Sequence, residues 1–116
     1  YYRHTRKKTL YRRYSEDRDD CLRGEAMLNE ENKALCWEVL TKHGIRQQRL
    51  MVLEECAELQ KAVCKMFREA TNGHTDDFHE ELVDVIVMCQ QMLLADRISM
   101  EEVNKQATIK LQRALK

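Results

Sequence analysis

The stretch EELVDVIVMCQQMLL, residues 80–94, combines acidic residues with an almost unbroken apolar segment. A stripe at helical spacing runs through Glu81, Val85, Met88 and Met92. This spacing predicts a helix whose stripe faces a core. A glutamate on such a stripe is unusual, because a buried ionised group needs a partner. Asp84 lies one turn along, at the edge of the same stripe, so this helix carries two carboxylates towards its packed side.

Another acidic cluster, EECAEL at residues 54–59, lies about one helix length earlier in the chain. Glu55 and Glu58 are three residues apart and share a helix face. The neighbouring apolar stripe consists of Val52, Cys56, Leu59, Val63 and Met66. Glu54 projects nearly opposite this stripe and is the weaker candidate.

Two helices with these pairs would direct four carboxylates into one space. The candidate metal ligands are Glu55, Glu58, Glu81 and Asp84. A hard divalent cation such as Mg²⁺, which prefers oxygen ligands, would offset their repulsion. Either acidic pair alone is more typical of a solvated helix surface. Both pairs together, one bordering an apolar stripe and one within it, favour a metal site.

The composition predicts an all-α domain. The 116 residues include no proline and three glycines, and helix-forming residues dominate. We expect four helices, at about 29–43, 46–70, 77–96 and from Ser99 onward. Asn29 and Ser99 are the predicted N-caps, and Gly44 is a predicted helix stop. Leu35, Cys36, Val39 and Leu40 are expected to form the apolar face of the first helix, with Trp37 beside it.

The helix spanning residues 82–94 is apolar on nearly every side. Such a helix needs packing partners all round, and one small monomeric bundle would leave part of it in water. We therefore expect a homodimer or a larger homo-oligomer centred on this helix.

Residues 1–26 differ from residues 27–116 and form a predicted N-terminal extension. They hold all four tyrosines, a basic run and then an acidic run. A solvated, weakly ordered tail is favoured over a nucleic-acid contact. The net charge of zero argues against general nucleic-acid affinity. Five cysteines without close pairing are typical of reduced cytoplasmic thiols, and no apolar run predicts a membrane span or signal peptide.

The two acidic motifs resemble those of a known family. The segments RLMVLEECAEL, residues 49–59, and EELVDV, residues 80–85, are similar to the motifs of the all-α nucleoside triphosphate pyrophosphohydrolases. These form the MazG-like superfamily, and the likeness is to its small bacterial and phage members. The resemblance covers roughly Met27 to the C-terminus. It implies a four-helix MazG-like bundle that oligomerises, as a homodimer or homotetramer.

The resemblance also implies an activity. The reaction would be Mg²⁺-dependent hydrolysis of nucleoside triphosphates to a nucleoside monophosphate and pyrophosphate, with Mn²⁺ as a possible substitute. This would clear unwanted nucleotides from the cytoplasmic pool. Glu55 or Glu58 would accept the proton of the attacking water. The substrate-binding candidates are Gln48, Trp37, Lys110 and Arg113. Gln48 would contact the substrate, Trp37 would stack on the nucleobase, and Lys110 and Arg113 would contact the phosphates.

Each of these assignments has a structural alternative. Trp37 would equally fill the core, Gln48 would be an ordinary surface residue, and Lys110 and Arg113 would lie on an exposed helix face. His74 is interpreted as a loop residue rather than a general base. Two other functions remain open: the phosphoribosyl-ATP pyrophosphohydrolase reaction of the same superfamily, and a non-catalytic helical interaction module. The last helix lacks the Asn and Tyr of some relatives, which leaves the preferred base and sugar open.

Overall fold

A computed structural model describes residue 18, residues 22–68 and residues 75–116. Within these residues the elements are α3 (Glu30–His43), α4 (Ile45–Arg68), α5 (Thr75–Ala95) and α6 (Met100–Ala114), and no strand occurs among them. The predicted all-α class and its four helices are confirmed. None of the helices described here is long and apolar enough to cross a membrane.

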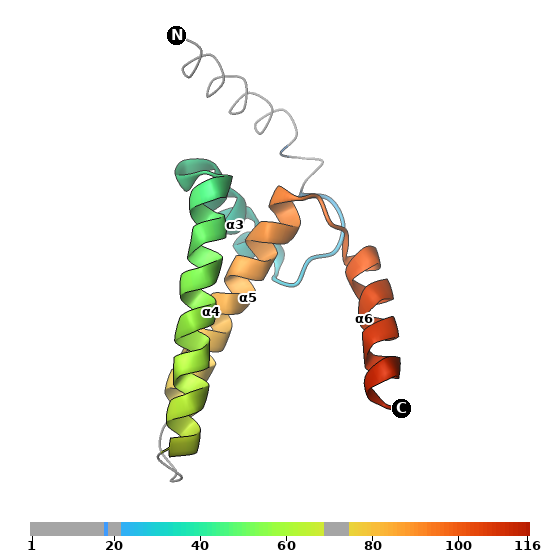
Figure 1. Ribbon diagram of the computed structural model, residues 1–116. Helices are drawn as coiled ribbons and strands as arrows, with labels where there is room; N and C mark the ends of the chain where they lie inside the picture. Colours follow the sequence, from blue (N-terminus) through green and yellow to red (C-terminus); the bar gives the residue numbers. More distant parts are fainter. Residues whose placement is uncertain (1–17, 19–21, 69–74) are drawn as a thin grey trace.

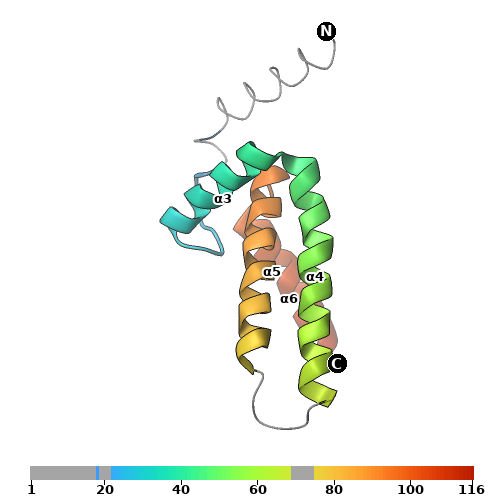
Figure 2. The ribbon, with the colours of Figure 1, turned by 90° about the vertical axis from the view of Figure 1, so that its left-hand side faces the viewer.

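Helices α4 and α5 form an antiparallel pair and lie side by side in both views (Figures 1 and 2). Ion pairs join them near both ends. Arg49 contacts Asp96, and Lys65 Nζ lies 3.1 Å from Asp77 Oδ2. The predicted stripes of the two helices are buried or half-buried along this contact. The ion pairs and the stripes together set the register in which α4 faces α5.

Helix α3 crosses the end of this pair where α4 begins and α5 ends (Figure 2). The core cluster there consists of Cys36, Trp37, Leu40 and Leu94. The predicted face of α3 was partly wrong, because Leu35 is 48% exposed and Val39 38% exposed. Helix α3 meets α5 obliquely, so the side centred on Trp37 and Leu40 is covered instead.

The predicted N-caps at Asn29 and Ser99 and the predicted stop at Gly44 are confirmed. The Asn29 side chain accepts a hydrogen bond of 2.9 Å from the Asn32 N–H, and the Ser99 hydroxyl accepts one of 3.1 Å from the Glu102 N–H. Gly44 ends α3 with φ 89° and ψ 152°, and its N–H donates to the Leu40 carbonyl. Because that backbone conformation is essentially restricted to glycine, Gly44 sets the sharp turn from α3 into α4.

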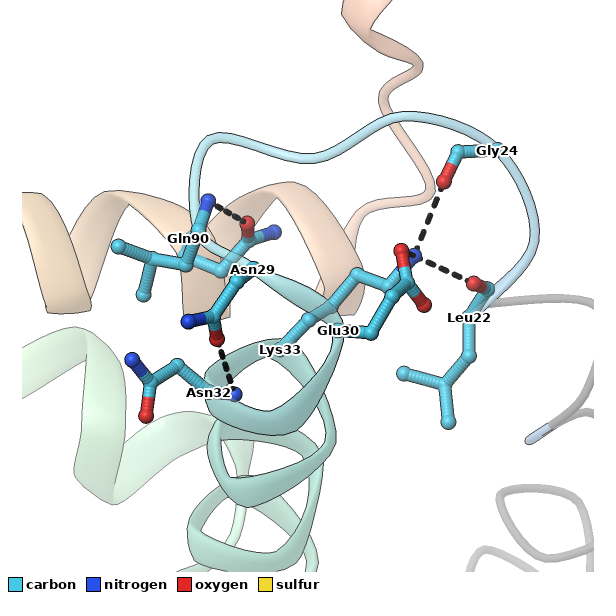
Figure 3. A network of polar contacts seen from close by, with 8 residues as sticks. Leu22, Gly24, Asn29, Glu30, Asn32, Lys33 and Gln90 are labelled. Atoms are coloured by element: carbon cyan, nitrogen blue, oxygen red, sulfur yellow. Dashed lines mark hydrogen bonds and ion pairs between the residues drawn. The ribbon is translucent and has the colours of Figure 1, made fainter.

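A buried lysine ties the chain before α3 to the helical core (Figure 3). Lys33 is only 2% exposed. Its Nζ donates to the carbonyl oxygens of Leu22 and Gly24 and pairs with Glu30 at 3.3 Å. Nearby, the Leu28 N–H donates to Gln90 Oε1 at 3.1 Å. These bonds hold residues 22–28 against α3 and α5; residues 1–17 and 19–21 of the predicted extension lie outside the described residues.

Helix α6 stands apart from the α4–α5 pair (Figure 1), and none of its side chains is buried. Three helices therefore pack together, and the fourth projects from the end of α5. Large apolar side chains remain exposed on several helices: Leu53, Phe67, Val83, Ile109, Leu111 and Leu115. The fold leaves α6 and one side of the α4–α5 pair without an apolar partner from the described chain.

Candidate metal centre

Three of the four predicted carboxylates meet between α4 and α5. Glu55 of α4 and Glu81 and Asp84 of α5 each offer a carboxylate oxygen, and these oxygens all lie within 4.8 Å of one another. Spacing explains the α5 pair, because residues three apart share a helix face. The antiparallel register then places Glu55 opposite them. Glu55 and Glu81 are half-buried and Asp84 is exposed, so the cluster opens to solvent on one side.

The cluster is electrostatically unfavourable in the absence of a cation. Desolvation raises the pKa of Glu55, and repulsion from Asp84, Glu54 and Glu58 raises it further. Desolvation also raises the pKa of Glu81, with added repulsion from Asp84, Glu58, Glu55 and Glu80. Partial burial and like charges both disfavour the ionised form. The arrangement therefore favours a positive charge at this place.

The donor set fits Mg²⁺. All three side chains offer oxygen, which is the ligand that Mg²⁺ prefers. In an octahedral site with Mg–O distances of about 2.1 Å, two oxygens on opposite sides of the ion are about 4.2 Å apart. The observed limit of 4.8 Å is only slightly larger, so small side-chain rotations would bring the oxygens to a single ion. Mg²⁺ usually retains several waters, and the exposed side of the cluster has room for them.

Glu58 is an exposed residue of α4 and lies outside this group of three. It is near enough to raise the pKa of both Glu55 and Glu81. Glu58 therefore borders the cluster, where it would contact a bound ion through water or accept a proton. Glu54 is exposed, as its position on the helix predicted.

Two of the predicted substrate-binding residues, Gln48 and Trp37, are buried. Gln48 is 6% exposed and Trp37 is 3% exposed. Gln48 lies on α4 two turns before Glu55, on the face that carries the cluster. Trp37 belongs to the core cluster with Leu40 and Leu94, so its ring packs against protein atoms. Of these two residues, only Gln48 follows the face of the acidic cluster.

Lys110 and Arg113 are exposed on α6. Because α6 stands apart from α4 and α5 (Figure 1), the fold of a single chain does not bring these cations to the carboxylates. Their assignment to the substrate phosphates stays a prediction. His74 lies outside the described residues.

Gln91 is a polar residue near the site that the sequence reading did not single out. It is 2% exposed, and its side-chain Oε1 has no hydrogen-bond partner. The available signal was spacing: Gln91 follows Asp84 by seven residues, as Gln48 precedes Glu55 by seven.

A scan against models of known protein families found no match to this chain. Searches of curated proteins and of solved structures likewise found no match.

Proposed function

We propose that the chain is a MazG-like pyrophosphohydrolase that cleaves nucleoside triphosphates between the α and β phosphates in a Mg²⁺-dependent reaction. The observation that carries this proposal is the convergence of Glu55, Glu81 and Asp84 from two helices within 4.8 Å. A glutamate pair on one helix and a Glu-x-x-Asp pair on the next also supply the motif resemblance. Two of the three carboxylates are half-buried, and like charges held together away from water are unfavourable unless a cation or a proton offsets them.

The residues have distinct roles in this proposal. Glu55, Glu81 and Asp84 would hold the ion, and Glu58 would lie beside it. Bound Mg²⁺ would neutralise phosphate charge and orient the attacking water. Glu55 or Glu58 accepts the proton of that water. The water oxygen attacks the α phosphorus, the bond from this phosphorus to the oxygen that bridges the α and β phosphates breaks, and pyrophosphate leaves. Lys110 and Arg113 contact the triphosphate by charge-assisted hydrogen bonds.

We further propose a homo-oligomer, dimeric or tetrameric, with its sites near subunit contacts. Val83 on α5 is 56% exposed, and Leu111 on α6 is 64% exposed. Exposed apolar side chains that recur along neighbouring helices are typical of an interaction surface. A second copy of the chain would cover them and would bring the basic residues of another α6 towards the carboxylates.

The direct test is pyrophosphate release from a panel of nucleoside triphosphates, with Mg²⁺ and with a chelator. Glu81→Gln should abolish release, since it removes a ligand charge while keeping the side-chain shape. Glu80→Gln is the matched control, because the adjacent Glu80 is exposed and lies outside the ligand group. Retained release in Glu81→Gln would contradict the ligand assignment.

The same panel separates the alternatives. Release from phosphoribosyl-ATP alone would assign the chain to that reaction of the superfamily. No release from any nucleotide, with a stability that Mg²⁺ leaves unchanged, would indicate a non-catalytic interaction module. The exposed apolar surface is the observation that favours this second candidate.

A further inference from the structure

Gln91 Oε1 is the one buried side-chain nitrogen or oxygen of the described residues that lacks a hydrogen-bond partner. The amide nitrogen of Gln91 makes only a long contact of 3.9 Å with Met88 Sδ. Buried polar groups nearly always have a partner, and an exception in a folded protein calls for an explanation. The neighbouring Gln90 shows the usual situation, because its Oε1 accepts from the Leu28 N–H.

The register of α4 and α5 places Gln91 opposite Gln48. Glu55 and Asp84 face each other in the acidic cluster. From this pair, seven residues towards the start of α4 lead to Gln48, and seven towards the end of α5 lead to Gln91. The helices are antiparallel, so both steps run in the same direction, and each covers two turns or about 10.5 Å. Two buried amides therefore lie at one level, on the face that carries the carboxylates.

Apolar side chains separate the two polar levels. Met88 is buried, and Met51 and Val52 are half-buried. Ligand pockets in proteins commonly have this pattern of apolar walls with a few placed polar groups. The two methionines have flexible side chains and can move aside to admit a flat ring. The span between the levels is comparable to that of a nucleotide from its α phosphate to the outer edge of its base.

We infer that Gln91, opposite Gln48, binds the edge of the nucleobase and selects bases that carry an exocyclic amino group. This inference rests on the proposed nucleotide hydrolysis. Because the Gln91 amide nitrogen donates to Met88 Sδ, the free end of the amide is the acceptor Oε1, and the matching ligand group is a donor. Cytosine and adenine present an amino donor where uracil and thymine present a carbonyl oxygen. A carbonyl facing Gln91 Oε1 would leave two acceptors unpaired, and such sites reject the wrong analogue strongly.

The test measures binding in Mg²⁺ with non-hydrolysable α,β-methylene analogues of dCTP and dUTP, which differ in the exocyclic group at C4 and in the proton on the adjacent N3. Inorganic tripolyphosphate serves as the probe without a base. The unmodified chain should bind the dCTP analogue at least about tenfold more tightly than the dUTP analogue. Gln91→Leu should bring that ratio close to one and leave tripolyphosphate binding unchanged.

Gln90→Leu is the matched control, because it removes a buried amide from the adjacent position of the same helix. Gln90→Leu should lower the melting temperature and leave the ratio of the dissociation constants of the two analogues unchanged. If Gln91→Leu does not fold, the side-chain amide resonance of ¹⁵N-labelled Gln91 in the unmodified chain gives a second test. That resonance should shift with the dCTP analogue and not with tripolyphosphate.

The outcomes separate this inference from the function on which it rests. A ratio unaffected by Gln91→Leu, with normal tripolyphosphate binding, overturns the inference and leaves the proposed function standing. An equal loss of affinity for both analogues in Gln91→Leu would show that Gln91 only supports the fold, as a buried amide pair with Gln48. A chain that binds neither tripolyphosphate nor any nucleotide in Mg²⁺ would overturn the proposed function and this inference together.

Discussion

Glu55 and Glu81 lie on different helices and bring carboxylate oxygens within 4.8 Å of each other, with Asp84 in the same group. Desolvation is the largest cause of the raised pKa of each glutamate, Asp84 raises both pKa values further, and Glu55 adds to the rise at Glu81. Such a contact opposes folding unless a cation or a proton offsets it. The pair therefore links the stability of the α4–α5 contact to whatever binds there, and this link is measurable.

The first prediction concerns Mg²⁺ and stability. In a chelator, Glu81→Gln should melt at a higher temperature than the unmodified chain, because it removes one of the repelling charges. Mg²⁺ should raise the melting temperature of the unmodified chain, since a ligand bound only to the folded state stabilises it, by about 2.7 kcal/mol at a hundred times its Kd. The variant should gain much less.

Calorimetric melting of both proteins with and without Mg²⁺ checks this prediction. Glu80→Gln is the control and should respond to Mg²⁺ like the unmodified chain. An equal gain in Glu81→Gln would mean that the ion binds elsewhere.

The second prediction concerns pH. The pKa of Glu55 and of Glu81 is raised in the folded chain, so the folded state holds these protons more tightly than the unfolded state. Their contribution to stability is therefore most favourable at low pH and is lost as the pH rises through the raised pKa. Without metal, the melting temperature of Glu81→Gln should exceed that of the unmodified chain most clearly at neutral pH. This difference should shrink as the pH falls towards 4.5, the ordinary pKa of the carboxyl group.

The sign of this pH dependence is tested by melting the variant and the unmodified chain in a chelator across that pH range. A difference that grows on acidification would refute it. Bound Mg²⁺ should abolish the higher melting temperature of Glu81→Gln at neutral pH, because a nearby cation reverses the electrostatic preference of the carboxylates.

The third prediction concerns Lys33. Lys33→Met keeps most of the side-chain volume and leaves the carbonyl oxygens of Leu22 and Gly24 without their donor. An unsatisfied polar group costs about 1–3 kcal/mol, so the free energy of unfolding should fall by that amount. Denaturation followed by the fluorescence of Trp37, the single tryptophan of the chain, measures the change. Lys42→Met, at an exposed position of the same helix, should change it by less than about 0.5 kcal/mol.

The acidic site was accessible from the sequence because it depends on helical period. Glu81 and Asp84 share a face by spacing alone, and Glu55 borders the apolar stripe of α4. The burial of Lys33 depends on residues 22–24, which approach α3 from before its start, and no periodicity encodes that contact. The exposure of Leu35 and the position of α6 likewise follow from how helices cross, which the pattern within one helix does not determine.

The fourth prediction concerns Gly44. Gly44→Ala should destabilise the chain by about 1–3 kcal/mol, because residues with a side chain are strained at φ 89° and ψ 152°. No atom lies within 4 Å of the added Cβ, so the loss would come from the backbone rather than from a clash. Denaturant titration checks it, and Gly44→Asn should lose a similar amount, since Asn tolerates positive φ mainly in the αL region and not at ψ 152°. Equal stability of Gly44→Ala would show that the turn adopts another conformation in solution.

The fifth prediction concerns the basic residues of α6. Replacing Lys110 and Arg113 together by Ala should weaken tripolyphosphate binding at least about tenfold, the scale expected for lost hydrogen bonds to a charged group. The melting temperature should barely change, because α6 buries none of its side chains. Lys105→Ala, also exposed on α6, is the control.

Whether those cations act within one chain or between chains can be decided by mixing. The Glu81→Gln chain lacks a metal ligand, and the double α6 variant lacks the phosphate contacts, so each alone should release little pyrophosphate. If α6 of one copy serves the carboxylates of another, co-expression of the two should restore part of the activity, because some sites then combine an intact cluster with an intact α6. Since α6 stands apart from the α4–α5 pair within one chain (Figure 1), we expect this recovery. Its absence, in an oligomer shown to contain both chains, would mean that α6 folds back onto its own cluster when substrate binds.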